Sequence, residues 1–340
     1  MQPAIKSLFF PLHIKWYITG KCNLRCRHCY LTDYTKQMSF ERIENFIKYF
    51  ASKKVRGIGL LGGEPLIRDD LEDIVYLISK ENIITKIASN GTLISADRAK
   101  NLVQNGCKQY QISLEGHSPE FSDPVRGKGT FEKSLKGASI LKNEGAWVSF
   151  AVTISKQNAK YIEQIHNLAL QAGIDQLKVA AFVPIGTGKM YQESYGLTRD
   201  IVVEVRNKLI YLKKKYPQLK IDSKFLPSES INCSEQCFTF GCGAGTSDLI
   251  INSDLTLSAC DILVEEDKTK KMIETPDDIE YLWNNDSLFN KWRGNAPEER
   301  TLNIKDFRNV HRAGCHVGLT TPFWENCTLR NTNPYHYSVF

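Results

Sequence analysis

The sequence lacks any apolar run that approaches ~20 residues, the length a membrane-spanning helix needs. Its first residues lack the basic region, apolar stretch and small-residue cleavage site of a secretory signal. Basic residues are scattered rather than gathered with aromatics, so a formal net charge of +6 does not indicate a nucleic-acid-binding face. Solenoid-type repeats and low-complexity segments are also missing. We therefore expect a cytoplasmic, globular protein with no membrane or nucleic-acid partner.

Cysteine, in contrast, is abundant, with ten in 340 residues. Without an export signal, metal ligands or redox groups are a better interpretation than disulfides. Cys22, Cys26 and Cys29 lie within eight residues, directly after a strand-like run at 13–19. Three thiolates on one loop can hold three irons of a cubane [4Fe-4S] cluster. No fourth cysteine is near them in sequence, so one iron would stay open to a non-protein ligand.

Simpler interpretations of these three cysteines are buried thiols, a zinc site or a disulfide pair. The interleaved Lys21, Arg25 and Arg27 are not typical of a core segment. Zinc loops favour paired Cys-x2-Cys elements that complete a four-ligand site, and only one such pair is present here. The pattern therefore favours an iron–sulfur cluster.

From residue 13 to about 215 the sequence alternates between strand-like and helix-like segments with short connections. This order predicts parallel βαβ units. Six units are too few for a closed eight-stranded barrel, so we predict an α/β fold built on a partial (β/α)6 TIM-type barrel. Ligands of such folds gather at the C-terminal ends of the strands. The expected strands are 13–19, 58–61, 83–88, 109–114, 147–153 and 177–182, and the expected helices begin near 39, 69, 97, 131, 161 and 200.

Beyond residue 215 the alternation stops. We expect residues 1–215 to form the partial-barrel domain, and residues 216–340 to form a small cysteine-rich α+β domain with a C-terminal tail. The second part should contain a short strand at 220–225, a hairpin between 249 and 257, and helices at 275–283 and 288–292.

The second strand ends in Gly62-Gly63-Glu64-Pro65. Two glycines let a backbone pass close to a ligand, and proline stiffens the exit. The Glu64 carboxylate can accept hydrogen bonds from an ammonium group. Alone, such a segment is more often an ordinary turn. Its position one βα unit after the three cysteines favours a ligand-binding role.

Together, the cysteine loop with Tyr30 after it and the Gly62-Gly63-Glu64-Pro65 motif resemble the radical S-adenosylmethionine (SAM) superfamily, over residues 13 to about 182. The resemblance implies an enzyme that reductively cleaves SAM, bound to the open iron, to a 5′-deoxyadenosyl radical that abstracts hydrogen from substrate. It implies that Gly62, Gly63 and Glu64 bind the methionyl ammonium. It also implies an external electron donor of flavodoxin or ferredoxin type.

Three later segments resemble the same family. Asn90, in the Ser-Asn-Gly that ends the third strand, would line the SAM site. Ser113, at the end of the fourth, would contact the SAM ribose or carboxylate, while Glu115 stands where the family usually has aspartate. Arg126 lies in a segment where an arginine approaches the SAM carboxylate, although a lone loop arginine is often only solvated.

The C-terminal cysteines resemble a SPASM or twitch domain, which carries auxiliary iron–sulfur clusters. The resemblance rests on Cys242-Gly243-Ala244-Gly245, the expected hairpin and Cys260, with Leu255 at a position where the family has glycine. It implies one auxiliary [4Fe-4S] cluster, because too few cysteines remain for two. The expected ligands are Cys242, Cys260, Cys315 and Cys327, with Cys237 as the alternative to one of them.

Three other residues have less defined interpretations. Asp261 matches the position of a proton-accepting catalytic aspartate in some peptide-oxidising relatives, or it simply ends the hairpin. Cys233 is a spare ligand, a hydrogen-atom donor or a plain loop thiol. Cys107 is expected to pack in the core.

The sequence therefore predicts a radical SAM enzyme that modifies a peptide or protein by cross-linking, oxidation or epimerisation, as maturases of ribosomally made peptides do. The alternative is the same chemistry on a sugar, nucleotide or cofactor precursor. About a dozen residues precede the first strand, so we expect any leader peptide to need a separate binding protein. A non-enzymatic iron–sulfur carrier is a third hypothesis, which the Gly62-Gly63-Glu64-Pro65 motif argues against.

Overall fold

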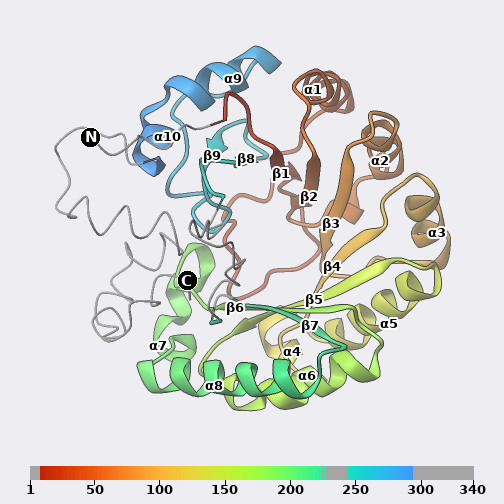
Figure 1. Ribbon diagram of the computed structural model, residues 1–340, viewed down its shortest axis with the longest axis vertical. Helices are drawn as coiled ribbons and strands as arrows, with labels where there is room; N and C mark the ends of the chain where they lie inside the picture. The colour runs from red at the N-terminus through yellow and green to blue at the C-terminus, as the bar shows by residue number, and fades with distance from the viewer. Residues whose placement is uncertain (1–7, 224, 227–242, 294–340) are drawn as a thin grey trace, which may run out of the picture.

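The computed structural model describes residues 8–223, 225–226 and 243–293. Nine strands in these ranges form one sheet in the order β7-β6-β5-β4-β3-β2-β1-β8-β9. The strands follow an arc, and α1, α2, α3, α5, α6 and α8 lie on its outer side (Figure 1). β7 and β9 end the order and are not paired with each other. The fold is therefore the unclosed partial barrel that the sequence predicts.

The elements follow the expected βα alternation. The strands are β1 His13–Thr19, β2 Gly57–Gly62, β3 Ile84–Ser89, β4 Gln109–Ser113, β5 Trp147–Ile154, β6 Gln176–Ala181, β7 Lys220–Ser223, β8 Asp248–Ile251 and β9 Leu257–Ser258. The α-helices are α1 Phe40–Ser52, α2 Leu71–Lys80, α3 Ala96–Gln104, α4 Pro119–Arg126, α5 Thr130–Asn143, α6 Ile162–Gln171, α7 Gln192–Tyr195, α8 Arg199–Lys215, α9 Pro276–Asn285 and α10 Ser287–Trp292. Short 3₁₀ helices are η1 Pro65–Ile67, η2 Ala159–Tyr161 and η3 Gly186–Tyr191. The sequence did not predict α4, η3 or α7.

Helix α1 shows how the outer layer forms. Ser39 caps it, because the Ser39 side chain accepts a hydrogen bond from the backbone N–H of Arg42 at 3.4 Å. Its buried residues are Ile43, Phe46, Ile47 and Phe50. This stripe packs on Trp16 of β1, whose ring centroid lies 5.9 Å from that of Phe46 and 5.3 Å from that of Phe50. Because side chains alternate along a strand, Trp16 on the helix side places Lys15 and Tyr17 on the inner side of the arc.

The C-terminal part joins the same sheet. β8 runs parallel to β1, with His13 opposite Asp248 and Trp16 opposite Ile251. β8 and β9 form the expected antiparallel hairpin. Both strands, like β7, follow residue 215, and the domain boundary expected there stays a prediction.

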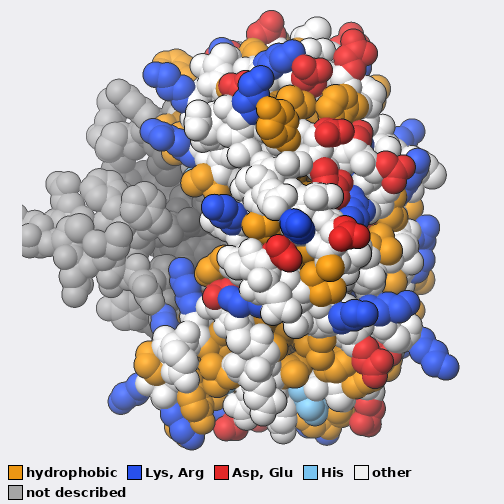
Figure 2. All heavy atoms as spheres, turned by 90° about the vertical axis from the view of Figure 1, so that its right-hand side faces the viewer, with side chains coloured by type: hydrophobic (Ala, Val, Ile, Leu, Met, Phe, Trp, Pro, Cys, Tyr) orange, Lys and Arg blue, Asp and Glu red, His pale blue; other side chains and the backbone are white. Residues whose placement is uncertain are grey.

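The outer surface carries both signs of charge. Figure 2 shows lysine and arginine side chains interspersed with aspartate and glutamate on the face that it presents. None of the helices in the described ranges is long and apolar enough to cross a membrane.

Candidate active site

Residues 20–38, which we call the cysteine loop, connect the C-terminal end of β1 to α1 and carry Cys22, Cys26 and Cys29. All three thiols are free and partly exposed. Burial raises the pKa of the Cys22 thiol to about 11. Burial also raises the pKa of Cys26, and the guanidinium of Arg126 opposes that rise.

The structure does not bring these three side chains into one ready coordination group, and residues 8–223, 225–226 and 243–293 hold no other group of three His, Cys, Asp or Glu that could bind a metal ion. The fit to a cluster rests instead on the donor set. Three free, solvent-reachable thiols on a single loop are the ligands that iron–sulfur clusters use.

The exit of β2 packs directly against the cysteine loop. The backbone N–H of Gly63 donates to the Thr19 carbonyl at 2.9 Å, and that of Glu64 donates to the Lys21 carbonyl at 2.9 Å. A Cβ on Gly63 would lie closer than 3.0 Å to the carbonyl oxygens of Gly20 and Lys21 and to the Cβ of Cys22. Glycine at position 63 is therefore required for the two loops to approach this closely.

Glu64 links the ends of β2 and β3. Its carboxylate is fully buried, and Oε1 accepts hydrogen bonds from Ser89 Oγ at 2.8 Å and from the Leu66 N–H at 3.1 Å. Oε2 accepts from the Asn90 N–H at 2.7 Å. Burial raises the pKa of Glu64 even though these hydrogen bonds favour the charged form. A carboxylate has about four acceptor positions, so one remains for the ammonium contact that stays a prediction.

Asn90 joins the end of β3 to the cysteine loop. Its Nδ2 donates to Asn23 Oδ1 at 2.9 Å, and Asn23 Nδ2 donates to Thr92 Oγ1 at 2.9 Å. Asn23 lies between Cys22 and Cys26, so this pair fixes the loop between two expected ligands. The sequence singled out Asn90 and missed Asn23.

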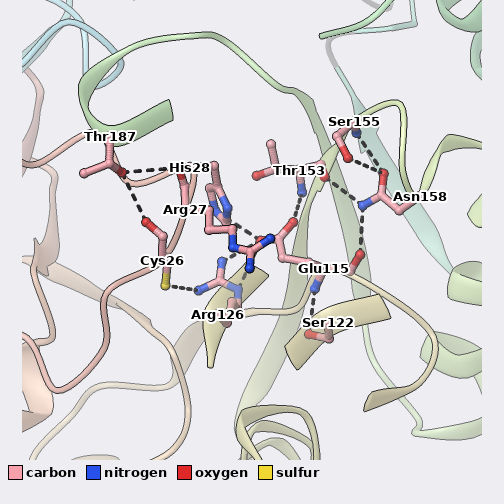
Figure 3. A network of polar contacts seen from close by, with 10 residues as sticks. All are labelled: Cys26, Arg27, His28, Glu115, Ser122, Arg126, Thr153, Ser155, Asn158 and Thr187. Atoms are coloured by element: carbon pink, nitrogen blue, oxygen red, sulfur yellow. Dashed lines mark hydrogen bonds and ion pairs between the residues drawn. The ribbon is translucent and has the colours of Figure 1, made fainter. Parts of the chain in front are cut away.

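On the opposite side, the segment after β6 holds the same loop. The Thr187 N–H donates to the Cys29 carbonyl at 3.0 Å. Thr187 Oγ1 lies 3.2 Å from the Cys26 carbonyl oxygen (Figure 3). A Cβ on Gly186 would lie 2.5 Å from the Cys29 carbonyl oxygen. The sequence missed these contacts, and its only signal was Gly186-Thr187-Gly188 shortly after the sixth strand.

A buried ion pair lies beside Cys26 (Figure 3). The side chains of Glu115 and Arg126 are 1% and 10% exposed, and Arg126 Nη2 lies 2.6 Å from Glu115 Oε1. Arg126 Nη1 is 3.8 Å from Cys26 Sγ, and Glu115 Oε2 accepts from the Thr153 N–H at 2.8 Å. His28 Nε2 lies 3.4 Å from Glu115 Oε1. In this structure Arg126 is bound to Glu115, and its contact with a SAM carboxylate stays a prediction.

Two further expected site residues lie on the inner side of the sheet. Ser113 is half-buried, ends β4 and faces Ala151 of β5 across the ladder. Asp261 Oδ2 lies 2.6 Å from Lys15 Nζ, and the Asp261 carbonyl accepts a hydrogen bond from the Tyr17 hydroxyl at 3.3 Å. Asp261 is therefore tied to β1, the strand that leads into the cysteine loop, and its catalytic role stays a prediction.

The structure describes only part of the expected auxiliary ligand set. Cys260 is the second residue after the end of β9 and is buried, with 6% of its surface exposed. The other cysteines named for the C-terminal part lie outside the described residues: Cys233, Cys237, Cys242, Cys315 and Cys327. Cys107 is fully buried, as expected for a packing cysteine.

The sequence is similar to known proteins. Residues 16–169 match the model of the Radical SAM superfamily. Fe-coproporphyrin III synthase of Methanosarcina barkeri is 32% identical over 207 residues, which are 58% of this chain and 52% of that protein. Mycofactocin maturase MftC of Mycobacterium tuberculosis is 25% identical over 292 residues, 85% of this chain and 74% of that one. AdoMet-dependent heme synthase of M. barkeri is 26% identical over 329 residues, 90% and 91% of the two chains.

Solved structures share the fold. Streptococcus suis SuiB bound to S-adenosylmethionine superposes with a TM-score of 0.70 at 19% identity, over 97% of this chain and 76% of that chain. anSMEcpe with bound AdoMet and the Kp18Cys peptide gives a TM-score of 0.67 at 20% identity, over 85% of each chain. Residues 16–169, which include Cys22, Cys26 and Cys29 of the cysteine loop, thus match the Radical SAM superfamily, whose members use a [4Fe-4S] cluster and S-adenosylmethionine.

Proposed function

We propose that this radical SAM enzyme modifies a peptide or protein by cross-linking, oxidation or epimerisation. The observation that carries the proposal is the fixation of the cysteine loop from both sides, by Asn90 after β3 and by Thr187 after β6. A loop held in this way presents its thiols at the C-terminal strand ends, where ligands of such folds gather.

The relatives support a peptide substrate. MftC is named a mycofactocin maturase, and SuiB has been solved bound to its precursor peptide SuiA, with a TM-score of 0.70 over 97% of this chain. anSMEcpe has likewise been solved with bound peptides. A separate leader-binding protein and an external electron donor of flavodoxin or ferredoxin type are part of the proposal.

In the proposed mechanism, Cys22, Cys26 and Cys29 would hold the cluster, which together with SAM would supply the radical chemistry for hydrogen abstraction from the substrate. Gly63 lets the exit of β2 lie against Cys22, and Glu64 fixes that exit to the end of β3. Thr187 orients the loop backbone between the second and third cysteines.

Arg126 places a positive charge next to Cys26 Sγ, and Glu115 holds the guanidinium there. The charge stabilises a thiolate, since an opposite charge within ~4–6 Å favours the ionised form. Gly62, Asn90 and Ser113 would bind SAM at the neighbouring strand ends.

We further propose one auxiliary [4Fe-4S] cluster, held by Cys242, Cys260, Cys315 and Cys327, with Cys237 as the alternative ligand. The burial of Cys260 beside the β8–β9 hairpin supports a protected ligand rather than a surface thiol. Asp261 next to it would accept a substrate proton. Iron analysis of a Cys22/Cys26/Cys29→Ala triple variant tests the cluster count, because about four irons should remain for one cubane and about eight for two.

Anaerobic incubation of the reconstituted protein with dithionite and SAM tests the enzymatic step. 5′-Deoxyadenosine should form, and a Cys26→Ala variant should form none. Peptides encoded next to the gene should then gain a mass change in the presence of the wild-type protein. Loaded protein that never cleaves SAM would refute the enzyme, whereas cleavage without peptide change would refute the peptide substrate.

A cofactor precursor is the second candidate substrate. Two of the relatives are named for tetrapyrrole products, haem and Fe-coproporphyrin III, and the haem synthase aligns with 90% of this chain. The same assay with Fe-coproporphyrin III in place of the peptide distinguishes the two.

A further inference from the structure

On the inner side of the partial barrel, five residues of neighbouring strands lie opposite one another, and two of them are lysines that the mechanism above does not use. In the strand register, Lys15 of β1 lies opposite Gly59 of β2, and Gly59 lies opposite Lys86 of β3. The same level continues through Gln109 of β4 to Trp147 of β5. We call these five residues the lysine level.

Strand alternation fixes the side to which these residues point. Trp16 and Ile87, the neighbours of Lys15 and Lys86, are both fully buried in the main hydrophobic core, and Trp16 stacks on the helix α1. Lys15 and Lys86 therefore face the inner side of the arc. Gly59 lies between them and adds no side chain of its own, while Leu61 Cδ1 approaches to 3.4 Å from where a Gly59 Cβ would lie.

The charges on this inner side are unevenly matched. Lys15 forms an ion pair with Asp261. Lys178 Nζ of β6 lies 3.8 Å from Asp222 Oδ2 of β7. Lys86 forms no ion pair with a carboxylate in the described ranges, and its Nζ lies 5.6 Å from the ring centre of Trp147.

The surroundings of Lys86 disfavour an unpaired positive charge. Burial, Lys178 and Lys15 together lower the pKa of Lys86 to about 8, and Asp222 only partly offsets them. A bound anion would compensate the charge, because an opposite charge nearby restores the protonated form. The chemistry of the lysine level is therefore that of an anion site.

We propose that Lys86, with Gln109 and Trp147 of the lysine level, binds a carboxylate of the substrate inside the partial barrel. This inference rests on the proposed function, since it names the chemical class of the substrate of that same site. The carboxylate comes from an acidic side chain or the C-terminus of a peptide, or from the propionates of a tetrapyrrole, and the experiment below separates these sources.

The position of Lys86 on β3 also sets the distance between the proposed carboxylate site and the cysteine loop. Lys86 lies three residues before Ser89, the last residue of β3, which corresponds to ~10 Å along the strand. The cysteine loop lies at that strand end, where Asn90 contacts Asn23. An extended peptide covers ~10 Å in about three residues. A peptide substrate should therefore carry its carboxylate about three residues from the residue that is modified.

Protection of Lys86 from trinitrobenzenesulfonate, which attacks neutral amines, tests the proposal without turnover. The reconstituted protein with SAM is labelled at pH 7, and each lysine is quantified by peptide mass mapping. Lys86 should react faster than the exposed Lys80 of α2. Acetyl-Ala-Ala-Ala-Glu-amide should protect Lys86 at a concentration about tenfold lower than acetyl-Ala-Ala-Ala-Gln-amide, because hydrogen bonds to charged groups contribute about 1.5–3 kcal/mol.

Further arms identify the source of the carboxylate. Acetyl-tetra-alanine with a free C-terminus is compared with its amide, and coproporphyrin III represents the tetrapyrroles. Whichever protects at the lowest concentration identifies the source. The preference should weaken as the pH rises through about 8, since Lys86 then loses the proton that attracts the anion.

Variants make the outcome specific to this site. Peptide binding to Lys86→Gln, measured by calorimetry, should no longer distinguish the Glu from the Gln peptide, while Lys86→Arg and the surface variant Lys80→Gln should still do so. Equal protection by all neutral and acidic probes would overturn the carboxylate site and leave the peptide proposal standing. Absence of SAM cleavage would overturn the proposed function without affecting this binding readout.

Discussion

Glu115 Oε1 accepts two hydrogen bonds from the guanidinium of Arg126, one from Nε at 3.1 Å and one from Nη2 at 2.6 Å. The pair joins the end of β4 to the end of α4 and lies against Cys26. Glu115 occupies a position where the radical SAM family usually has aspartate. The longer side chain reaches Arg126 and the Thr153 N–H at the same time.

Breaking this pair on one side should destabilise the protein strongly. Arg126→Met leaves the Glu115 carboxylate buried without its cation, which typically costs about 3–5 kcal/mol. The double variant Glu115→Gln/Arg126→Met buries no charge and should recover part of that loss. Urea unfolding of the metal-free proteins, followed by tryptophan fluorescence, measures both. Equal midpoints for the single and double variants would show that the two charges are not coupled.

The Thr187 hydroxyl should slow the release of iron from the cysteine loop. Thr187→Val keeps the shape but removes the hydrogen bond to the loop carbonyls, a loss of about 1 kcal/mol or roughly fivefold in an equilibrium. Thr187→Ser keeps the hydroxyl and serves as the control. Iron transfer to a chelator from reconstituted protein should be about fivefold faster for the valine variant. If serine and valine release iron at the same rate, the hydroxyl does not hold the loop.

Gly63→Ala should prevent normal cluster assembly. The added Cβ would collide with the Gly20 and Lys21 carbonyls, so the cysteine loop must move away from β2. Gly59→Ala, whose Cβ would meet only Leu61 Cδ1 at 3.4 Å and the Ile14 carbonyl at 3.9 Å, is the matched control. Iron and sulfide per chain after reconstitution should fall for Gly63→Ala and stay near the wild-type value for the control. A full cluster complement in Gly63→Ala would contradict the close approach described above.

Position 255 should prefer glycine over alanine. Leu255 lies in the hairpin between β8 and β9 with φ at +68°, a left-handed conformation that costs residues with a Cβ about 1–2 kcal/mol. Leu255→Gly and Leu255→Ala both lose the leucine side chain, but only glycine relieves the backbone strain. Thermal unfolding should therefore rank Leu255→Gly above Leu255→Ala. The opposite order would mean that the turn relaxes out of the left-handed region.

His166 should make stability depend on pH. It is fully buried on α6, and its ring centroid lies 5.1 Å from that of Tyr216, with the rings tilted by 44°. Neither ring nitrogen has a hydrogen-bond partner in the described ranges. Burial lowers its pKa below the usual ~6.5, and the neighbouring side chains of Asn167 and Glu163 only partly oppose this shift. The unfolded chain then takes up the proton first, so folding stability falls as the pH drops below ~6.5.

The variant His166→Leu removes this protonation step. Its melting temperature should fall less than that of the wild type between pH 7 and pH 5, and its advantage should be greatest at the lower pH. Parallel melting curves for the two proteins across this range would argue against a buried neutral histidine. The exposed Lys80→Gln variant controls for a general effect of substitution.

The sequence predicted the features that depend on local patterns. The apolar spacing that produced α1, the cap at Ser39 and the cysteine spacing are all contained within a few residues. Helix α4 was missed because Pro119 and Pro124 disfavour a helix in a local analysis, although proline at the first turn is tolerated.

The anchors of the candidate site depend on contacts between distant residues. Glu115 reaches Arg126 across 11 residues and Thr153 across 38, so no local spacing reveals the network. Thr187 binds backbone carbonyls of the cysteine loop, and any residue supplies those, so its partners leave no trace in the sequence. Lys86 was not singled out because its significance depends on the strand register that places it beside Gly59.

The parallel pairing of β8 with β1 has a consequence for the order of folding during translation. His13 and its partner Asp248 are separated by 235 positions, so at 5–20 residues per second β1 leaves the ribosome ~10–50 s before β8. Throughout that interval one edge of β1 has unpaired backbone groups, the kind of edge that other chains can join. The strand that leads into the cysteine loop is thus exposed to aggregation until the C-terminal part has been synthesised, so slow or interrupted translation after residue 223 should lower the yield of correctly folded protein.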